Sequence, residues 1–325
     1  MAKVFVTGAT GCLGNYLSRY LSAQGHQVVA QGRDIQAARG LVAAGITFLP
    51  FDLRGDYPDA AFKSVDIIFH CAALSSAWGT AEAFQTINVT ATQRLLSAAT
   101  KAQVQKFVFA SSPSIYANGK DRFNLSEEAS LPNHFPSHYA RTKYEAECLV
   151  MAADQQNGMR TTAIRPRAIY GAGDRSLMPR LLEAIQRGRV PMINGGESLI
   201  DITHVTDAAR AMSLAGFKNE AGGEIFNITS GVAFRFSELL AAVCALKNAK
   251  PREIHIKYES AMRLAKSLEF LHRIFMPAKE PVITCQAVAS LGRSLTLDIS
   301  KAKTLLGYVP MMAMEDGIRD YVNSL

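Results

Sequence analysis

Three side chains of this sequence could carry out proton transfer together. Tyr139 and Lys143 are four residues apart, so on a helix both would project from one face, and Ser112 lies upstream of them. A free phenol has a pKa of about 10, too high for proton transfer at neutral pH, but an adjacent ammonium lowers it. In this arrangement Tyr139 would give its proton to a carbonyl oxygen as hydride adds to the carbonyl carbon, while the Ser112 hydroxyl holds that oxygen. Taken alone, the Tyr139–Lys143 pair would more often be a chance feature of a helix surface, so the rest of the chain decides.

A glycine-rich turn near the start of the chain could bind a dinucleotide. The apolar run Lys3–Thr7 is typical of a buried parallel strand, and a helical spacing follows the turn until Gly25. Gly8 would allow a tight turn, Gly11 the approach of a pyrophosphate to the first helix amides, and Gly14 close packing of helix on strand. The predicted cofactor-binding residues of this turn are Gly8, Thr10, Gly11, Cys12, Leu13 and Gly14. An ordinary glycine turn is the alternative, and the flanking strand and helix disfavour it.

The end of the second predicted strand, residues 27–31, bears on the choice of nicotinamide cofactor. An acid at this place usually binds the adenine-ribose 2′-hydroxyl of NAD. Here Gly32 leaves space and Arg33 offers a guanidinium to a 2′-phosphate, which favours NADP(H). NAD(H) stays an alternative, because Asp34 could be the ribose-binding acid as well as an N-cap of the next helix.

Composition restricts the class of protein and of partner. The chain has 325 residues with 48% hydrophobic content, enough for a full α/β core and a smaller second lobe. The net charge of +7 is dispersed, which favours small anionic ligands and gives no reason to expect nucleic-acid binding. Its five cysteines are scattered and form no CxxC pair, so neither disulfides nor a metal site is expected. A core strand follows Met1 almost at once, and we therefore expect no targeting peptide and a cytoplasmic location.

Strand and helix patterns alternate along the first half of the chain. Strands are predicted at 46–49, 65–69, Lys106–Ala110 and 161–164, and helices at 86–100 and 139–155. This alternation predicts an α/β fold with a doubly wound parallel Rossmann sheet. Beyond Pro166, glycines and prolines separate shorter elements. We therefore expect a dinucleotide-binding domain at 1–172, with segments near 199–230 returning to it, and a mainly substrate-binding C-terminal lobe at 173–325.

Together these motifs resemble those of the extended short-chain dehydrogenase/reductase family, over nearly the whole chain. The resemblance implies the roles already given for Ser112, Tyr139 and Lys143, the last two also touching the cofactor. It implies further cofactor contacts from Asp52, Leu53, Ala72, Ala73, Asn88, Pro166, Ala168 and Ile169. Individual segments also have structural explanations: Asn88 as a helix cap, Asp52 as a turn residue and Pro166 as part of a strand end. Two positions depart from the family's pattern, where Ala91 replaces a usual glycine and Thr206 a usual aspartate.

Within that family the sequence is more similar to the 3β-hydroxysteroid dehydrogenase-like branch, which includes bacterial 2-alkyl-3-ketoalkanoate reductases. The similar stretches are 73–79, 112–114, 177–182 and 186–189. The resemblance implies a large apolar substrate bearing a ketone or secondary alcohol. It also implies a homodimer, because paired helices often form dimers in this family.

Three other functions are compatible with a dinucleotide-binding fold. A nucleotide-sugar epimerase usually has an arginine just before the position of Asp201, whereas residues 198–200 offer no cation. A dehydratase needs an acid pair next to the catalytic hydroxyl, where this chain has Pro113 and Ser114. A non-catalytic dinucleotide sensor would not need Tyr139. The epimerase remains the first alternative and the sensor the second.

The stretch 261–276 has an apolar helical stripe with basic residues beside it. Leu264, Leu268, Leu271 and Phe275 recur at helical spacing, and Lys266 is among the basic residues between them. One hypothesis is a lid that covers an apolar substrate or makes a peripheral contact with an anionic membrane. The alternative is an ordinary helix packed on the second lobe.

Overall fold

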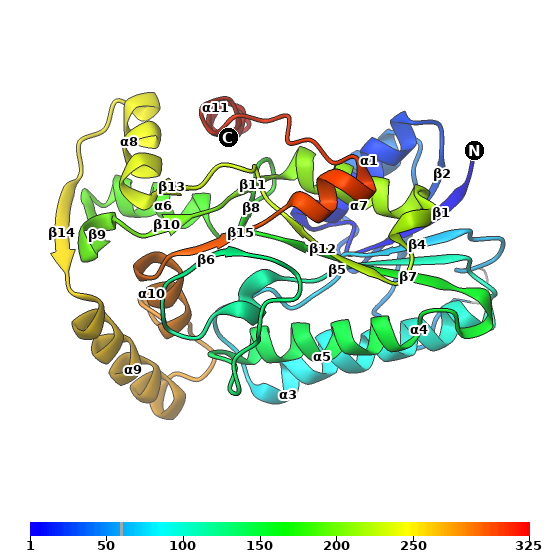
Figure 1. Cartoon of the computed structure of the whole chain (residues 1–325), viewed down its shortest axis with the longest axis horizontal. Helices are drawn as coiled ribbons and strands as arrows, with labels where there is room; N and C mark the ends of the chain where they lie inside the picture. Colours follow the sequence, from blue (N-terminus) through cyan, green and yellow to red (C-terminus); the bar gives the residue numbers. More distant parts are fainter. Residues whose placement is uncertain (59–60) are drawn as a thin grey trace.

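The computed structural model describes residues 1–58 and 61–325. Across these residues the central element is a parallel sheet of seven strands in the order β12-β7-β5-β4-β1-β2-β3 (Figure 1). The strands are β1 (Lys3–Thr7), β2 (Gln27–Gly32), β3 (Thr47–Pro50), β4 (Ile67–His70), β5 (Lys106–Ala110), β7 (Arg160–Pro166) and β12 (Glu224–Ile228). The doubly wound Rossmann sheet predicted from the alternating pattern is confirmed.

The strands form where the sequence has apolar, often β-branched runs, because helices cover both faces of the sheet. All of β4 is buried, as is most of β1 and β5. The predicted strands at 46–49, 65–69 and 161–164 are present with ends shifted by no more than two residues.

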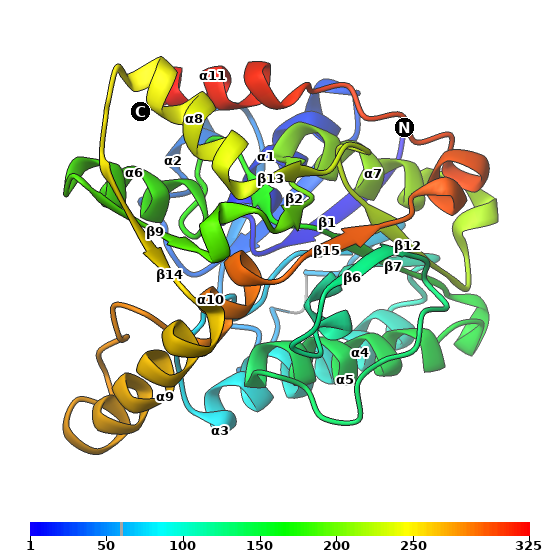
Figure 2. The ribbon, with the colours of Figure 1, turned by 60° about the vertical axis from the view of Figure 1, so that its left-hand side comes forward.

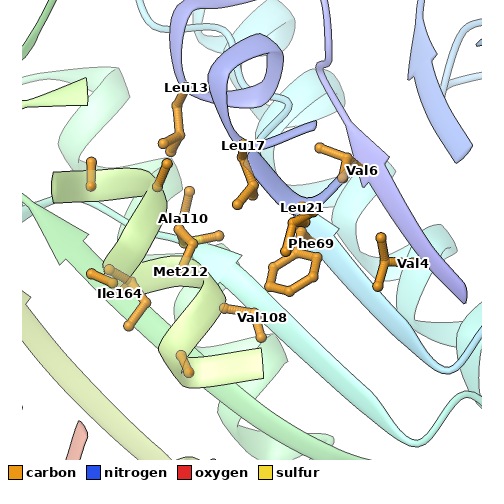
Figure 3. Packing of buried hydrophobic residues seen from close by; sticks show 14 of the residues in the cluster. Val4, Val6, Leu13, Leu17, Leu21, Phe69, Val108, Ala110, Ile164 and Met212 are labelled. Atoms are coloured by element: carbon orange, nitrogen blue, oxygen red, sulfur yellow. The ribbon is translucent and has the colours of Figure 1, made fainter. Parts of the chain in front are cut away.

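Two pairs of helices cover the two faces of the sheet. On one face lie α1 (Cys12–Ala23) and α7 (Val205–Phe217), and Figure 3 shows Leu17 and Met212 packed against Phe69 of β4. On the other face lie α4 (Ala91–Lys101) and α5 (His138–Ala152). The helix predicted at 86–100 consists of the π-helical segment η1 (Gln85–Thr90) and α4, and the one predicted at 139–155 is α5. The remaining helical segments of this half, in the described residues, are α2 (Arg39–Ala43), α3 (Ala81–Phe84) and the short turns η2 (Pro113–Tyr116) and η3 (Gln156–Gly158).

The second lobe is built from small sheets and five helices around its own core (Figure 2). Its strands are β8 (Ile169–Tyr170), β9 (Arg189–Ile193), β10 (Leu199–Ile200), β11 (Thr203–His204), β13 (Phe234–Arg235), β14 (Arg252–Ile256) and β15 (Leu295–Leu297). Its helices are α6 (Met178–Gln186), α8 (Phe236–Lys247), α9 (Tyr258–Phe275), α10 (Cys285–Gly292) and α11 (Met314–Asn323). Across 1–58 and 61–325, no helix combines the length and the hydropathy that crossing a bilayer requires.

The two halves of the chain exchange segments. Strand β6 (Arg122–Leu125) leaves the first half and pairs with β15 of the second lobe. In return, a segment after β15 brings Ile299, Ala302 and Tyr308 into the core beneath α7. The chain therefore crosses the expected division after residue 172 in both directions.

Substitution of Gly14 tests how closely α1 packs on the glycine turn. A Cβ at Gly14 would collide with the Gly8 carbonyl oxygen and lie 3.0 Å from the Ala9 Cα. These neighbours are backbone atoms, so we expect Gly14→Ala to lower the free energy of unfolding, measured in urea, by about 3 kcal/mol. Gly25→Ala is the control, because Gly25 has φ +82° with open space around it, and strain alone should cost about 1 kcal/mol. Equal losses in the two variants would contradict close packing as the cause.

Candidate active site

The predicted site residues gather along one edge of the central sheet. Gly8 follows β1, Gly32 ends β2, Ala72 follows β4, Ser112 follows β5 and Pro166 ends β7. Because these strands are parallel, their carboxyl ends share an edge, which is where open α/β sheets bind ligands. The structure thus brings together segments that lie up to 158 residues apart in the sequence.

The glycine turn packs closely against the segment after β4 and leaves the first amides of α1 without a side-chain cap. Gly8 has φ +63°, and a Cβ there would lie 2.7 Å from the Ala72 Cα, so the turn lies directly beside the segment after β4. Gly11 is the N-cap of α1 and has no side chain to accept hydrogen bonds from the first-turn amides. Those amides and the positive end of the helix dipole suit a pyrophosphate. Leu13 and Cys12 point elsewhere: Leu13 packs in the core, and the Cys12 thiol donates to the Ala172 carbonyl at 3.4 Å.

A chain of buried polar groups holds this turn against β4. The Thr7 hydroxyl oxygen accepts hydrogen bonds from the amides of Cys71 and Ala72, both at 3.1 Å. Its proton must then go to His70 Nδ1 at 2.7 Å, which leaves the His70 Nε2 proton for the Thr92 hydroxyl at 2.8 Å. Burial, together with the charge of Lys143, lowers the pKa of His70 to about 3, so the ring is neutral as this scheme requires. No local sequence pattern indicates these hydrogen bonds, because Thr7, His70 and Thr92 are polar residues inside or next to apolar runs.

The segments that follow β2 and β3 carry two arginines, Arg33 and Arg54. A Cβ at Gly32 would lie 2.9 Å from the Thr10 side chain, which brings these two predicted residues together. Arg33 Nη1 lies 3.7 Å from Asp52, and Arg54 donates to the same carboxylate at 2.7 Å. Chiefly through the Arg54 hydrogen bond, the pKa of Asp52 is lowered to about 2. Asp34 caps the following turn, where its carboxylate accepts from the Ala37 amide at 3.0 Å.

Two predicted cofactor contacts have their side chains engaged elsewhere. Leu53 is buried in the core on the α4–α5 face. Asn88 accepts from the Leu74 amide at 2.7 Å and donates to the Thr142 hydroxyl at 3.0 Å. Asn88 therefore ties the segment after β4 to α5, one residue before Lys143.

The structure brings Ser112 and Tyr139 together at the carboxyl end of β5. Burial raises the pKa of Tyr139, and hydrogen bonds with Ser112 and Ser75 oppose that rise. The Ser112 hydroxyl also donates to the Ser114 hydroxyl at 3.0 Å. A carbonyl oxygen placed between the Ser112 and Tyr139 hydroxyls would meet two donors once the Ser112 hydroxyl proton turns from Ser114 toward that oxygen.

Lys143 behaves differently from the sequence-based expectation. Its ammonium donates to the Ala110 carbonyl at 2.5 Å and lies 4.0 Å from the centre of the Phe109 ring. Burial lowers the pKa of Lys143 to about 7, although the Glu147 carboxylate acts to raise it. We expected this ammonium to lower the pKa of the Tyr139 phenol, whereas burial makes that pKa higher than usual. The Lys143 ammonium therefore contacts the Ala110 carbonyl, two residues before Ser112, while the half-buried Tyr139 phenol lies beside the hydroxyls of Ser112 and Ser75.

A buried ion pair fixes the helix that carries Tyr139 and Lys143. Glu147, one turn after Lys143, accepts two hydrogen bonds from Arg165 of β7, at 2.8 and 2.5 Å. Arg165 also donates to the Tyr116 hydroxyl, which donates to Asn227 of β12 at 3.1 Å. The network joins α5 to two strands of the sheet, and nothing in the local sequence around Glu147 indicates its partner.

The segment after β7 has an unusual backbone. Ala168 has φ +42°, in the left-handed region that non-glycine residues seldom adopt. The strain is compatible with a functional position, since such residues often line active sites. Pro166, two residues before Ala168, pairs with Ile228 of β12, and Ile169, directly after it, pairs with Thr203 of β11, so sheets hold the backbone on both sides of Ala168.

A cavity of about 450 Å³ borders Tyr139. Its lining includes Trp78, Phe84, Phe135, Arg141, Glu269 and Arg273. The Trp78 indole donates to the Pro277 carbonyl at 2.9 Å, and the Arg273 guanidinium lies 5.7 Å from the ring centre. Trp78 thereby connects the segment after β4 with the end of α9. Within 1–58 and 61–325, no three His, Cys, Asp or Glu side chains come together as metal ligands would.

A Rossmann sheet with a glycine turn and a Ser–Tyr pair at its carboxyl edge defines a dinucleotide-binding enzyme class. Over residues 4–229 the chain matches the NAD dependent epimerase/dehydratase family, and it belongs to that family. The resemblance to extended short-chain dehydrogenase/reductases is thus confirmed, and the protein is an NAD(P)-dependent enzyme.

Its relatives agree with the 3β-hydroxysteroid dehydrogenase-like branch. The chain is 32% identical to a 4-hydroxy-2-methyl-3-oxo-4-farnesyl-3,4-dihydroquinoline-1-oxide ketoreductase of Stigmatella aurantiaca, covering 97% of this chain and 94% of that one. It is 30% identical to a 2-alkyl-3-oxoalkanoate reductase of Stenotrophomonas maltophilia (98% and 97% covered). It is also 30% identical to a sterol-4-alpha-carboxylate 3-dehydrogenase, decarboxylating, of Mus musculus (99% and 90% covered). Among solved structures, MoeE5 in complex with UDP-glucose and NAD is similar, with a TM-score of 0.79, 27% identity and coverage of 99% and 98%.

Replacement of Glu147 tests the ion pair beneath Lys143. Glu147→Gln leaves the Arg165 guanidinium buried without a counter-charge, so we expect the free energy of unfolding in urea to fall by about 3–5 kcal/mol. The change also removes an influence that raises the pKa of Lys143, and that pKa should fall further. Glu145→Gln is the matched control, because Glu145 pairs with Arg141 at the surface and should cost less than about 1 kcal/mol. A small, equal loss in both variants would contradict this account.

Proposed function

We propose that the protein interconverts a ketone and a secondary alcohol on a large apolar substrate. The observation that carries the proposal is the pair of hydroxyls, Ser112 and Tyr139, at the carboxyl edge of the sheet and beside the glycine turn. The similarity to relatives named as a ketoreductase, a reductase and a 3-dehydrogenase supports the proposal. The second lobe, mainly 173–325, would bind the substrate, and Trp78, Phe84 and Phe135 give the cavity beside Tyr139 an aromatic part of its wall that suits apolar groups.

The chain's own residues would manage the substrate oxygen. A bound nicotinamide supplies hydride chemistry, and Ser112 donates a hydrogen bond to the carbonyl oxygen as negative charge develops on it. Tyr139 then gives its hydroxyl proton to that oxygen. Lys143 would hold the ribose hydroxyls, and its pKa of about 7 lets it gain or lose a proton near neutrality.

Removal of the Tyr139 hydroxyl tests the catalytic proposal. Tyr139→Phe should lower kcat by about 10²–10⁴-fold, the usual contribution of general acid catalysis, with NADPH affinity nearly unchanged. The assay is NADPH oxidation over a panel of apolar ketones, 3-keto acids and sugar nucleotides. Tyr144→Phe, on the same helix, is the control and should keep full turnover. Undiminished turnover in Tyr139→Phe would refute the assignment.

We propose NADP(H) as the preferred cofactor, with NAD(H) as the alternative. Asp34 is engaged with the Ala37 amide, and Asp52 faces two arginines, so neither acid is free to prefer a ribose 2′-hydroxyl. The Arg33 side chain is 67% exposed beside Gly32, where a 2′-phosphate could reach it.

Arg33→Ala tests that preference by binding alone. We expect the Kd for NADPH, measured by fluorescence titration, to rise about ten- to hundredfold, as for loss of a charge-assisted hydrogen bond. The Kd for NADH should change little. Arg187→Ala is the matched control, because Arg187 is similarly exposed on α6. Equal weakening of both cofactors in Arg33→Ala would count against a 2′-phosphate contact.

Nucleotide-sugar epimerisation is the second candidate, since the similar structure of MoeE5 is a complex with UDP-glucose and NAD. Residues 198–200 give no cation beside Asp201, and Asp201 itself accepts from the Leu297 amide at 2.7 Å. A non-catalytic dinucleotide sensor would show NADPH binding without turnover of any panel member. Homodimerisation and a cytoplasmic location belong to the same proposal.

A further inference from the structure

Exposed apolar side chains gather at one place, here called the α9 tip, residues 264–282. Of 18 large hydrophobic side chains exposed in the described part of the chain, seven lie in these 19 residues: Leu264, Phe270, Leu271, Ile274, Phe275, Met276 and Val282. Phe270 is 63% exposed and Phe275 is 73% exposed. Such a concentration marks an interaction surface, whereas scattered single residues do not.

This surface is distinct from the side of α9 that packs on the lobe. Tyr258, Ala261 and Ala265 are buried in a small core with Ile193 and Val288. The sequence stripe on 261–276 thus divides into a packed side and an exposed side. Both views place α9 at the outer margin of the second lobe, away from α8 and α11 (Figures 1 and 2).

The surroundings of the α9 tip are positively charged. Lysines and arginines of this region are Lys257, Arg263, Lys266, Arg273 and Lys279. The acids between them are engaged with groups outside the tip or with backbone: Glu280 pairs with Arg180 at 2.7 Å, and Glu269 accepts from the Cys285 amide at 2.7 Å. Glu259 lies 3.6 Å from Arg293. The nearby acids therefore neutralise little of the positive charge around the α9 tip.

We propose that the α9 tip docks on an anionic lipid surface. Phenylalanine, leucine and isoleucine side chains would enter the boundary between headgroups and acyl chains, while Lys266 and Lys279 lie against anionic headgroups. A second copy of the chain is a poorer occupant, since a twofold contact would place the same cations against each other. This docking does not depend on which reaction the enzyme carries out.

The position of the tip gives the docking a consequence for the cavity beside Tyr139. Glu269 and Arg273 of α9 line that cavity, and Trp78 joins its wall to Pro277 just after the helix. Docking would therefore set the cavity close to the lipid surface, where large apolar molecules dissolve.

Vesicle sedimentation of the full chain tests the proposal without any enzyme assay. Wild type should pellet with phosphatidylcholine vesicles that contain phosphatidylglycerol, and much less with phosphatidylcholine alone. The double variant Phe270→Ser/Phe275→Ser should bind at least ~10-fold more weakly, because it loses two aromatic anchors. Lys266→Glu/Lys279→Glu should weaken binding to anionic vesicles about 10-fold or more. The matched control is Val232→Ser/Met311→Ser, which alters equally exposed side chains outside the α9 tip and should bind as wild type.

Three results would overturn the proposal. The first is wild-type protein that stays in the supernatant with anionic vesicles. The second is equal loss of binding in the control and in the phenylalanine variant. The third is a concentration-dependent dimer on gel filtration that Phe270→Ser/Phe275→Ser abolishes, with no vesicle binding by wild type, because the tip would then be covered by a second copy.

Discussion

The buried pair of Arg165 and Glu147 determines where α5 lies against the central sheet. Both side chains are almost fully buried, and two parallel hydrogen bonds leave little freedom for the helix to slide or turn. Glu147, Lys143 and Tyr139 follow one another at intervals of one turn, so fixing the first fixes the height of the other two above the sheet. A buried ion pair need not add net stability, since the cost of desolvating both charges opposes their attraction. Its effect here is to select one position of α5 along β7.

Around Lys143 the fold assembles titratable groups in a setting of low polarity. His70 is held neutral and burial keeps Cys71 protonated, with a pKa of about 12, so neither supplies a counter-charge to the ammonium. Glu147 is the nearest acid that opposes the desolvation, and it is shared with Arg165. The charge of Lys143 at neutral pH is consequently set by a balance between burial and one partly committed carboxylate.

The sequence was sufficient for features that depend on local pattern. The strand at Lys106–Ala110, the glycine turn and the spacing of Tyr139 and Lys143 each follow from neighbouring residues, and the structure has the elements in those places. What could not be predicted depends on contacts distant in the chain. The Thr7–His70–Thr92 chain, the pairing of β6 with β15 and the bond from Lys143 to Ala110 join segments with no shared local signal. The raised pKa of Tyr139 could not be predicted from local sequence either, because burial depends on the assembled fold.

Trp78 is the single tryptophan of the sequence, and it occupies the junction between the segment after β4 and the end of α9. All intrinsic indole emission of the protein therefore originates at one point. Its colour and intensity depend on the hydrogen bond to Pro277 and on the nearby Arg273 guanidinium, both of which involve the end of α9 or the residues directly after it. The molecule thus carries a built-in optical reporter for any movement between its two lobes.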